Sequence, residues 1–344
     1  MKKTVFAALL ATSAVMAAVP AQARDQISIV GSSTVYPFAT VVAERFGRAS
    51  GNPTPTIEST GSGGGLKLFC DGIGENTPDI TNSSSYIKKS QYNACAKKGI
   101  EIHEVKVGYD GIALANSKRG PKFDVSQKDL FLALAAKVPG EKDGELIDNP
   151  YQTWKDVNSK LPAEKIRVLG PPPTSGTRAA FGELVMEKGC SKFGWIKALK
   201  KSDKSKFAEV CTTMREDGAF VEAGENDNLI VQKLVKEPTS FGIFGYSYLD
   251  QNSDKLQGAA FEGVDISFDS ISDGSYPVSR PLHFFIKKQH IGVIPGIMDY
   301  VNTFLSDAAQ GEDGYLAEKG LIPLGESELN AMRKSVNAQT VLKM

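Results

Sequence analysis

Alternating apolar and polar residues predict a strand near the start of the chain, followed by a helix. Residues 27–30 (Ile-Ser-Ile-Val) alternate as a short strand does. Apolar residues then recur at helical spacing over 38–46, with Pro37 in the expected first turn and Gly47 at the expected end. A turn rich in hydroxyl groups, over 31–37, joins the two. The pattern therefore predicts a strand, a hydroxyl turn and a helix in succession.

Three further stretches repeat this arrangement. A glycine and serine turn over 59–65 leads into apolar residues at helical spacing, which predict a helix as far as Ile73. A strand over 166–169 is followed by a turn over 174–178 and then by another helix. A weaker unit over 79–85 has a strand and a serine-rich turn without an immediate helix. The chain thus contains four turns that each follow a strand.

Turns of this kind suit a small anion. A helix that begins on glycine and serine presents free backbone N–H groups and the positive end of its dipole. Small side chains also let an anion approach the backbone closely. One such turn is most often only a helix cap or a connection. In open α/β sheets, however, ligands bind at the carboxyl ends of strands, so four turns predict one shared oxyanion site.

The remaining pattern is that of an α/β protein. Asp227 or Asn228 is expected to cap the helix that follows, because either side chain can accept a backbone N–H. Further strands are expected over 100–115, 241–249 and 282–286, and further helices over 229–235, 298–305 and 326–336.

The first 23 residues read as a secretory leader. A basic start, an apolar run over 5–19 and an Ala-Gln-Ala ending predict cleavage after Ala23. The apolar run is too short for a confident membrane span, and no cysteine at the cleavage site suggests a lipid anchor. A soluble periplasmic protein of residues 24–344 is expected. That length favours two lobes over a single core.

Charge and composition exclude several classes of function. The chain has 41% hydrophobic and 23% charged residues, as ordinary globular proteins do. Its 40 Lys and Arg balance its 40 Asp and Glu, and loss of Lys2 and Lys3 with the leader makes the mature chain slightly acidic. No basic stretch with interleaved aromatic residues predicts nucleic-acid binding. Local donors, rather than net charge, must therefore hold an anion.

The four cysteines are expected to form disulfides, since the leader places the protein in an oxidising compartment. Three pairings are possible. We expect Cys70 to pair with Cys95 and Cys190 with Cys211, because each pair closes a local loop within one lobe. Metal binding is not expected, because no Cys-x-x-Cys occurs and the three histidines have no ligand spacing.

Enzyme motifs are absent or incomplete. A nucleophile elbow fails at Ser62, because Thr60 stands where glycine is required. The Ser-x-x-Lys pattern of Ser85 and Lys88 lacks its companion motifs. The glycine run matches neither a dinucleotide fingerprint nor a P-loop, and Lys255 replaces the glycine of a calcium loop. No catalytic residue and no cofactor are therefore predicted.

Taken in order, the turns resemble those of the phosphate-binding protein of the high-affinity ABC-type phosphate importer. The stretches 107–115, 154–157 and 242–246 also lie where this family has similar sequences. The matching motifs are Gly31-Ser32-Ser33-Thr34-Val35-Tyr36-Pro37, Gly61-Ser62-Gly63-Gly64-Gly65, Asp79-Ile80-Thr81-Asn82-Ser83-Ser84 and Ser175-Gly176-Thr177. The resemblance implies an α/β, two-lobed periplasmic binding-protein fold of type II, with mixed sheets flanked by helices and the ligand in the interlobe cleft.

The resemblance also implies lobe boundaries and a ligand set. One lobe would comprise 24–106 with 281–344, and the other 107–280. Pro171 and Pro173 stand where the family has an arginine and an aspartate, and Arg178 is expected to replace that arginine. The expected phosphate-binding residues are Ser33, Thr34, Ser62, Ser84, Ser175, Gly176, Thr177 and Arg178.

Ser84 also departs from the family, which has an aspartate there to accept the proton of monohydrogen phosphate. A buried acceptor rejects sulfate, because sulfate has no proton to share. Asp110 or Asp217 is expected to take this role. If neither does, the ligand would be another tetrahedral oxyanion, such as sulfate or arsenate.

The expected function is a periplasmic solute-binding protein. The resemblance implies a monomer that closes its lobes on inorganic phosphate and presents it to an inner-membrane ABC phosphate permease. A secreted phosphate-ester hydrolase is the alternative from another class of protein. That enzyme would need a metal or an activated nucleophile, and the sequence shows neither.

Overall fold

The computed structural model describes residues 24–311 and 313–344, so the expected leader lies outside the described residues. The strands are β1 (Ser28–Gly31), β2 (Thr56–Ser59), β3 (Ile80–Ser83), β4 (Ile102–Ser117), β5 (Asp124–Val125), β6 (Lys137–Pro139), β7 (Leu146–Asp148), β8 (Val168–Gly170), β9 (Phe220–Glu222), β10 (Phe241–Gly245), β11 (Leu256–Gly258), β12 (Ala260–Phe261) and β13 (Ser279–Lys287). The α-helices are α1 (Tyr36–Ser50), α2 (Ser62–Phe69), α3 (Lys89–Lys97), α4 (Gln127–Leu134), α5 (Trp154–Val157), α6 (Gly176–Phe181), α7 (Glu187–Cys190), α8 (Gly194–Ser202), α9 (Lys204–Thr212), α10 (Asp227–Lys236), α11 (Tyr246–Asp250), α12 (Phe268–Ser272), α13 (Ile297–Phe304), α14 (Asp307–Gln310) and α15 (Glu326–Asn337). A π-helical turn, η1 (Gly182–Met186), links α6 to α7, and η2 (Lys288–His290) and η3 (Ala317–Lys319) are 3₁₀ turns.

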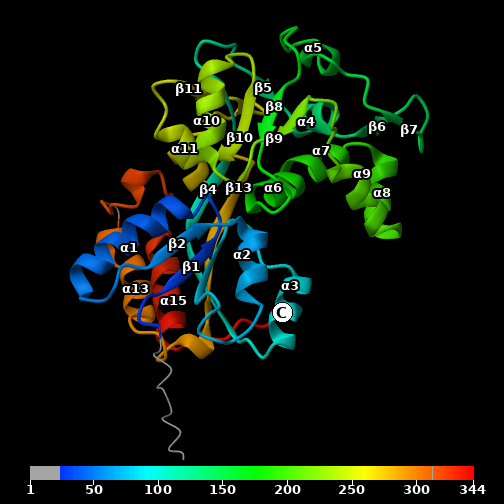
Figure 1. Cartoon of the computed structure of the whole chain (residues 1–344). Helices are drawn as coiled ribbons and strands as arrows, with labels where there is room; N and C mark the ends of the chain where they lie inside the picture. Colours follow the sequence, from blue (N-terminus) through cyan, green and yellow to red (C-terminus); the bar gives the residue numbers. More distant parts are fainter. Residues whose placement is uncertain (1–23, 312) are drawn as a thin grey trace, which may run out of the picture.

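One mixed sheet runs through the molecule in the order β2-β1-β3-β13-β4-β10-β8-β9. β1 is parallel to β2 and β3, and β13 is antiparallel to β3 and β4. The long strand β4 pairs with β13 over its first part, and its residues 112–115 pair with β10. β4 and β13 therefore connect the two halves of the molecule (Figure 1).

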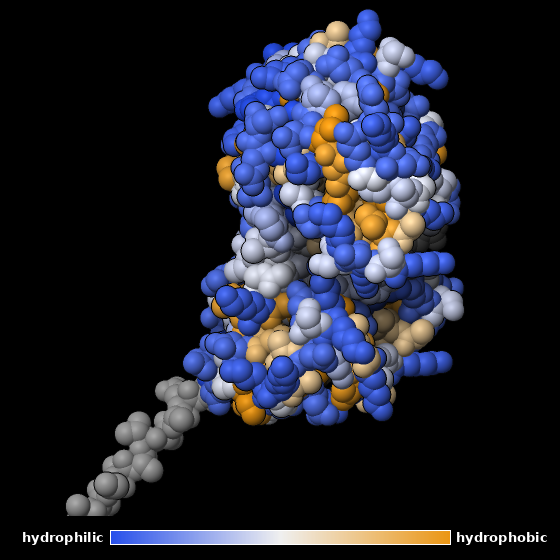
Figure 2. Space-filling view, turned by 90° about the vertical axis from the view of Figure 1, so that its right-hand side faces the viewer, coloured by the Kyte–Doolittle hydropathy of each residue, from blue (hydrophilic) through white to orange (hydrophobic). Residues whose placement is uncertain are grey.

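Each half has its own hydrophobic core. In the first lobe, α1 and α13 pack over β1, β3 and β13 around residues such as Phe38 and Phe284. In the second lobe, β8, β10 and the end of β4 lie under α4, α6 and α10, with Phe181 and Phe241 in the core. Tyr109 on β4 packs against both cores. The face shown in Figure 2 is mostly hydrophilic, with hydrophobic side chains in small groups on both lobes.

Several predicted elements are confirmed, and three details are wrong. The predicted strand over 282–286 and the predicted helices near 298–305 and 326–336 correspond to β13, α13 and α15. However, α2 begins inside the glycine run and ends before Ile73, which is 51% exposed. The segment 241–249 is a strand only to Gly245 and then becomes α11. Asn226, rather than Asp227 or Asn228, caps α10.

The expected disulfides are confirmed. Cys70 is bonded to Cys95 in the first lobe, and Cys190 is bonded to Cys211 in the second. Each bond ties neighbouring helices together, α2 to α3 and α7 to α9. Within the described part of the chain, no helix combines the length and apolar character needed to span a membrane.

Candidate functional site

The four predicted turns come together between the lobes. Three of them belong to the first lobe: the turn after β1, the start of α2 and the turn after β3. The fourth, at the start of α6, belongs to the second lobe. All of their hydroxyl residues are buried, with at most 3% exposure: Ser32, Ser33, Thr34, Ser62, Ser84, Ser175 and Thr177. We call this set the hydroxyl cluster.

Two turns of the first lobe bind each other directly. Gly61 has a φ of 72°, a conformation that glycine adopts easily, and it turns the chain into α2. The Ser62 Oγ then accepts a hydrogen bond of 3.0 Å from the Ser84 backbone N–H. The two hydroxyl oxygens are 3.4 Å apart. Ser62 and Ser84 therefore lie side by side, as their places at two strand ends predicted.

The second lobe meets these groups at the start of α6. Ser175 is the N-cap residue, and its Oγ accepts from the Thr177 N–H at 3.1 Å. The Thr177 Oγ1 lies 3.0 Å from the Thr34 Oγ1 of the first lobe. A Cβ atom on Gly176 would lie closer than 3.0 Å to the hydroxyl oxygens of Ser62 and Ser84. Glycine is therefore the residue that allows this approach.

Two further contacts hold the lobes together around the cluster. The Gly63 N–H at the start of α2 donates to the Thr174 carbonyl at 3.0 Å. The Tyr248 hydroxyl on α11 donates to the Ser33 carbonyl, also at 3.0 Å. Both bonds join the first lobe to the second. The structure is therefore a closed arrangement, with the cluster shielded from solvent.

An arginine that the sequence did not predict lies at the centre of the cluster. Arg280 on β13 is 4% exposed, and its Nη2 donates to the Thr34 Oγ1 at 3.2 Å and the Thr177 Oγ1 at 2.9 Å. Asp110 on β4 faces it, with 3.0 Å between Nη2 and Oδ2. The other Asp110 oxygen accepts from the Tyr246 N–H at 2.9 Å. One guanidinium thus contacts hydroxyl groups of both lobes.

Burial controls the charges of this pair. It raises the pKa of the Asp110 carboxyl, and the Arg280 guanidinium opposes that rise. A buried charge without a partner is very costly, so each group keeps the other ionised. The Arg280 Nη1 remains buried without a hydrogen-bond partner among the described residues. That free donor can bind an anion, and charge-assisted hydrogen bonds of this kind are strong.

Asp227 is a second charged residue that sequence reasoning misassigned. It is fully buried at the start of α10, and neither of its carboxylate oxygens has a hydrogen-bond partner of good geometry in the described part of the chain. Burial raises the pKa of this carboxyl to about 8, although the nearby Arg280 lowers it. Its position after Asn226 resembles an ordinary cap in the sequence, so only the tertiary structure identifies it.

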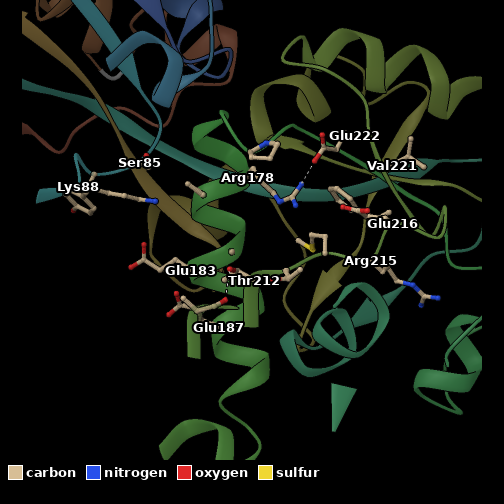
Figure 3. Close-up of a pocket in the computed structure, with 18 of the residues that line it drawn as sticks. Ser85, Lys88, Arg178, Glu183, Glu187, Thr212, Arg215, Glu216, Val221 and Glu222 are labelled. Carbon is tan, nitrogen blue, oxygen red and sulfur yellow. Dashed lines mark hydrogen bonds and ion pairs between the residues drawn. The ribbon is translucent and has the colours of Figure 1, made fainter. Parts of the chain in front are cut away.

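The other charged candidates lie elsewhere. Arg178 donates to the Pro171 carbonyl at 3.2 Å, lies 3.7 Å from the Glu222 carboxylate and stacks on Phe220. It lines a groove of about 1030 Å³ beside the cluster, where it points toward Glu222 (Figure 3). Asp217 binds Arg215 at the same groove. Neither Arg178 nor Asp217 has a recorded contact with the hydroxyl cluster.

The groove itself lies between the lobes. Most of its lining comes from α6, η1 and β9 of the second lobe, and the segment 85–88 comes from the first. Figure 3 shows Lys88 extending from that segment toward the helix that carries Glu183 and Glu187. Among the described residues, no group of three or more His, Cys, Asp or Glu side chains is placed to hold a metal ion.

Comparison with known proteins supports one family. The model of the PBP superfamily domain matches residues 17–308. The SphX protein of Synechococcus elongatus is 29% identical over 307 residues, which cover 88% of this chain and 78% of SphX. The phosphate-binding protein PstS of Staphylococcus saprophyticus is 29% identical over 294 residues, covering 83% of this chain and 78% of that protein.

Solved structures share the fold. An ABC-type phosphate transport receptor from Vibrio cholerae matches with a TM-score of 0.58 and 19% identity, covering 87% of this chain and 100% of the receptor. A phosphate-binding protein from Stenotrophomonas maltophilia matches with a TM-score of 0.62 and 13% identity, covering 90% of this chain and 94% of that protein. These similarities confirm the two-lobed α/β fold.

Proposed function

Because this chain belongs to the PBP superfamily domain family, we propose that it is a solute-binding protein that captures inorganic phosphate between its lobes. It delivers the ion to an ABC permease in the membrane. The support comes from relatives named as phosphate-binding proteins, which align over most of this chain. It also comes from the chemistry of the hydroxyl cluster.

One observation carries the proposal: a single buried guanidinium contacts hydroxyl groups of both lobes. The Arg280 Nη2 reaches Thr34 and Thr177, which belong to different lobes. A tetrahedral oxyanion placed here would accept from the arginine and from both hydroxyls at once. Binding the ion would therefore require both lobes, and closure would be coupled to capture.

The proposed ligand set follows from this geometry. It retains the hydroxyl and backbone groups expected from the sequence and takes Arg280 as its arginine. Arg178, expected in that role, makes its contacts at the neighbouring groove. The proposed set is Ser33, Thr34, Ser62, Ser84, Ser175, Gly176, Thr177 and Arg280.

The lobes and the site of action are part of the same proposal. Residues 24–106 with 281–344 form one lobe, 107–280 form the other, and β4 and β13 connect them. The protein acts as a monomer in the periplasm after cleavage behind Ala23, and it needs no cofactor. The burial of the whole hydroxyl cluster disfavours the ester hydrolase, because an ester group would have to pass through the closed interface.

Calorimetry tests the proposal. The mature protein is unfolded, dialysed and refolded to remove bound ligand, and it is then titrated with phosphate, arsenate and sulfate. Phosphate should bind with a Kd of ~1 μM or below, on the order of −8 kcal/mol. Absence of phosphate binding would contradict the function. Hydrolysis of a phosphate ester by the same preparation would instead favour the enzyme.

A further inference from the structure

Asp227 is a buried carboxyl group that the closed structure leaves without hydrogen bonds. Buried polar groups are nearly always paired, because an unpaired one loses its hydration without compensation. The free Arg280 Nη1 is also buried. An unpaired acceptor and an unpaired donor at the same site indicate a ligand that supplies the complementary groups.

The charges around Asp227 come from four elements. Arg280 on β13 lowers its pKa, whereas Asp110 on β4 and Glu225 in the segment before α10 raise it. The Ser33 hydroxyl, after β1, lowers the pKa slightly. The Tyr248 phenol on α11 also lies within electrostatic range, and burial keeps that phenol neutral by raising its pKa. Asp110 is neutralised by its ion pair with Arg280, so Asp227 is the acid whose charge can vary.

We propose that the proton of Asp227 decides which oxyanions the site accepts, so that sulfate is admitted when Asp227 is neutral and rejected when it is ionised. This assignment rests on the proposed function. A neutral carboxyl can donate a hydrogen bond to a fully ionised oxyanion. An ionised carboxylate can only accept, and it would face sulfate as an unpaired like charge.

Phosphate behaves differently, because it carries at least one proton over the physiological range. It can donate that proton to an ionised Asp227 or accept from a neutral one. Phosphate binding is therefore retained on both sides of the titration. Because the pKa of Asp227 is about 8, the switch falls within an accessible pH range. The selectivity of this site for phosphate over sulfate then increases with pH.

Sulfate titration across pH tests the assignment, since sulfate itself has no proton to lose in this range. The refolded wild-type protein is titrated with sulfate and with phosphate between about pH 6 and about pH 9.5. Above the pKa of Asp227, the sulfate Kd should rise by about tenfold per pH unit. Phosphate should remain bound throughout. A sulfate Kd that does not change with pH overturns the assignment without any variant.

Two variants localise the effect. In Asp227→Asn, the amide always donates and never ionises, so sulfate should bind equally well at both ends of the pH range. Glu225→Gln is the matched control, because it removes the neighbouring acid, and the wild-type pH dependence should persist. A pH dependence retained in Asp227→Asn overturns the assignment. Loss of phosphate binding by the wild-type protein at every pH would instead overturn the proposed function itself.

Discussion

Arg280 and Asp110 occupy directly opposed positions on β13 and β4, with 3.0 Å between Nη2 and Oδ2. The register of the two longest strands therefore sets this pair, rather than a loop. Neighbouring backbone groups in the sheet hold both side chains in place before any ligand binds. A site built on such a support is rigid where its charge is, and its hydroxyl groups are carried by turns around it.

Replacing Arg280 by lysine should weaken phosphate binding. The lysine keeps the positive charge but cannot reach Thr34, Thr177 and Asp110 together as the planar guanidinium does. We expect the phosphate Kd, measured by calorimetry, to rise about 100-fold, or ~3 kcal/mol. Arg178→Lys is the control, because Arg178 contacts Pro171 and Glu222 at the groove. A larger loss in the control would place the ligand in the groove.

Removing the Thr177 hydroxyl should weaken binding moderately. Thr177→Val keeps the shape of the side chain and deletes one hydrogen-bonding group that faces Thr34 and Arg280. One such bond contributes ~1–2 kcal/mol, so the phosphate Kd should rise about tenfold. Thr212→Val, on the helix α9, makes the same chemical change away from the cluster. Equal affinities for the two variants would contradict the role of Thr177.

A methyl group on Gly176 should hinder closure. In Gly176→Ala, the new Cβ meets the Ser62 and Ser84 hydroxyls at less than 3.0 Å. Overpacking of this kind costs ~1–3 kcal/mol, so we expect a Kd about tenfold higher or more. Small-angle X-ray scattering should show a more open molecule in excess phosphate. Gly182→Ala, whose nearest neighbour lies at 3.7 Å, should behave as wild type.

The stability of the ligand-free protein should decrease as pH rises from ~4 to ~8. The pKa of Asp227 is about 8 in the folded protein and ~3.9 when unfolded, so the folded state binds the additional proton in this interval. Its contribution is complete below the unfolded pKa and is lost as pH rises through the folded pKa. The slope is at most ~1.4 kcal/mol per pH unit.

Urea denaturation at several pH values measures this loss. In Asp227→Asn, the part of the slope due to Asp227 should disappear, since the amide does not titrate. A wild-type slope that the variant reproduces would show that other groups cause the dependence. Phosphate must be removed beforehand, because a ligand that binds only the folded state adds its own stabilisation.

The disulfide between Cys190 and Cys211 should stabilise the second lobe without affecting the ligand. The two residues are 21 apart in sequence, and closing a loop of that size contributes ~3 kcal/mol in the chain-entropy model. The double variant Cys190→Ser with Cys211→Ser should unfold at lower urea by about that free energy. Its phosphate Kd should equal that of the wild type. A changed Kd would show that the bond also positions α6.

The hydroxyl turns could be predicted from the sequence because local residues determine them. Each turn follows a strand, and the glycines and serines that bind an anion also shape the backbone there. Ser62 and Ser84 are 22 residues apart, yet their places at the ends of neighbouring strands were sufficient to bring them together. The disulfides were predictable for a similar reason, since both close short loops.

Arg280 and Asp227 could not be predicted in the same way. Arg280 is 246 residues from Thr34 and 103 from Thr177, and only the pairing of β13 with β4 brings it into the cluster. Asp227 follows Asn226 at a helix start, where a capping role is the ordinary explanation for an acid. Its burial depends on the packing of the second lobe against Arg280, which no local pattern contains.

The position of Asp110 and Arg280 on the strands that connect the lobes has a mechanical consequence. When two rigid bodies rotate about a common axis, points near the axis are displaced least and points at the rim most. We expect the charged pair to remain assembled while the start of α6 swings away with the second lobe. An incoming anion would then meet a stationary positive charge first, and Thr177 would complete its coordination last, at the end of the stroke.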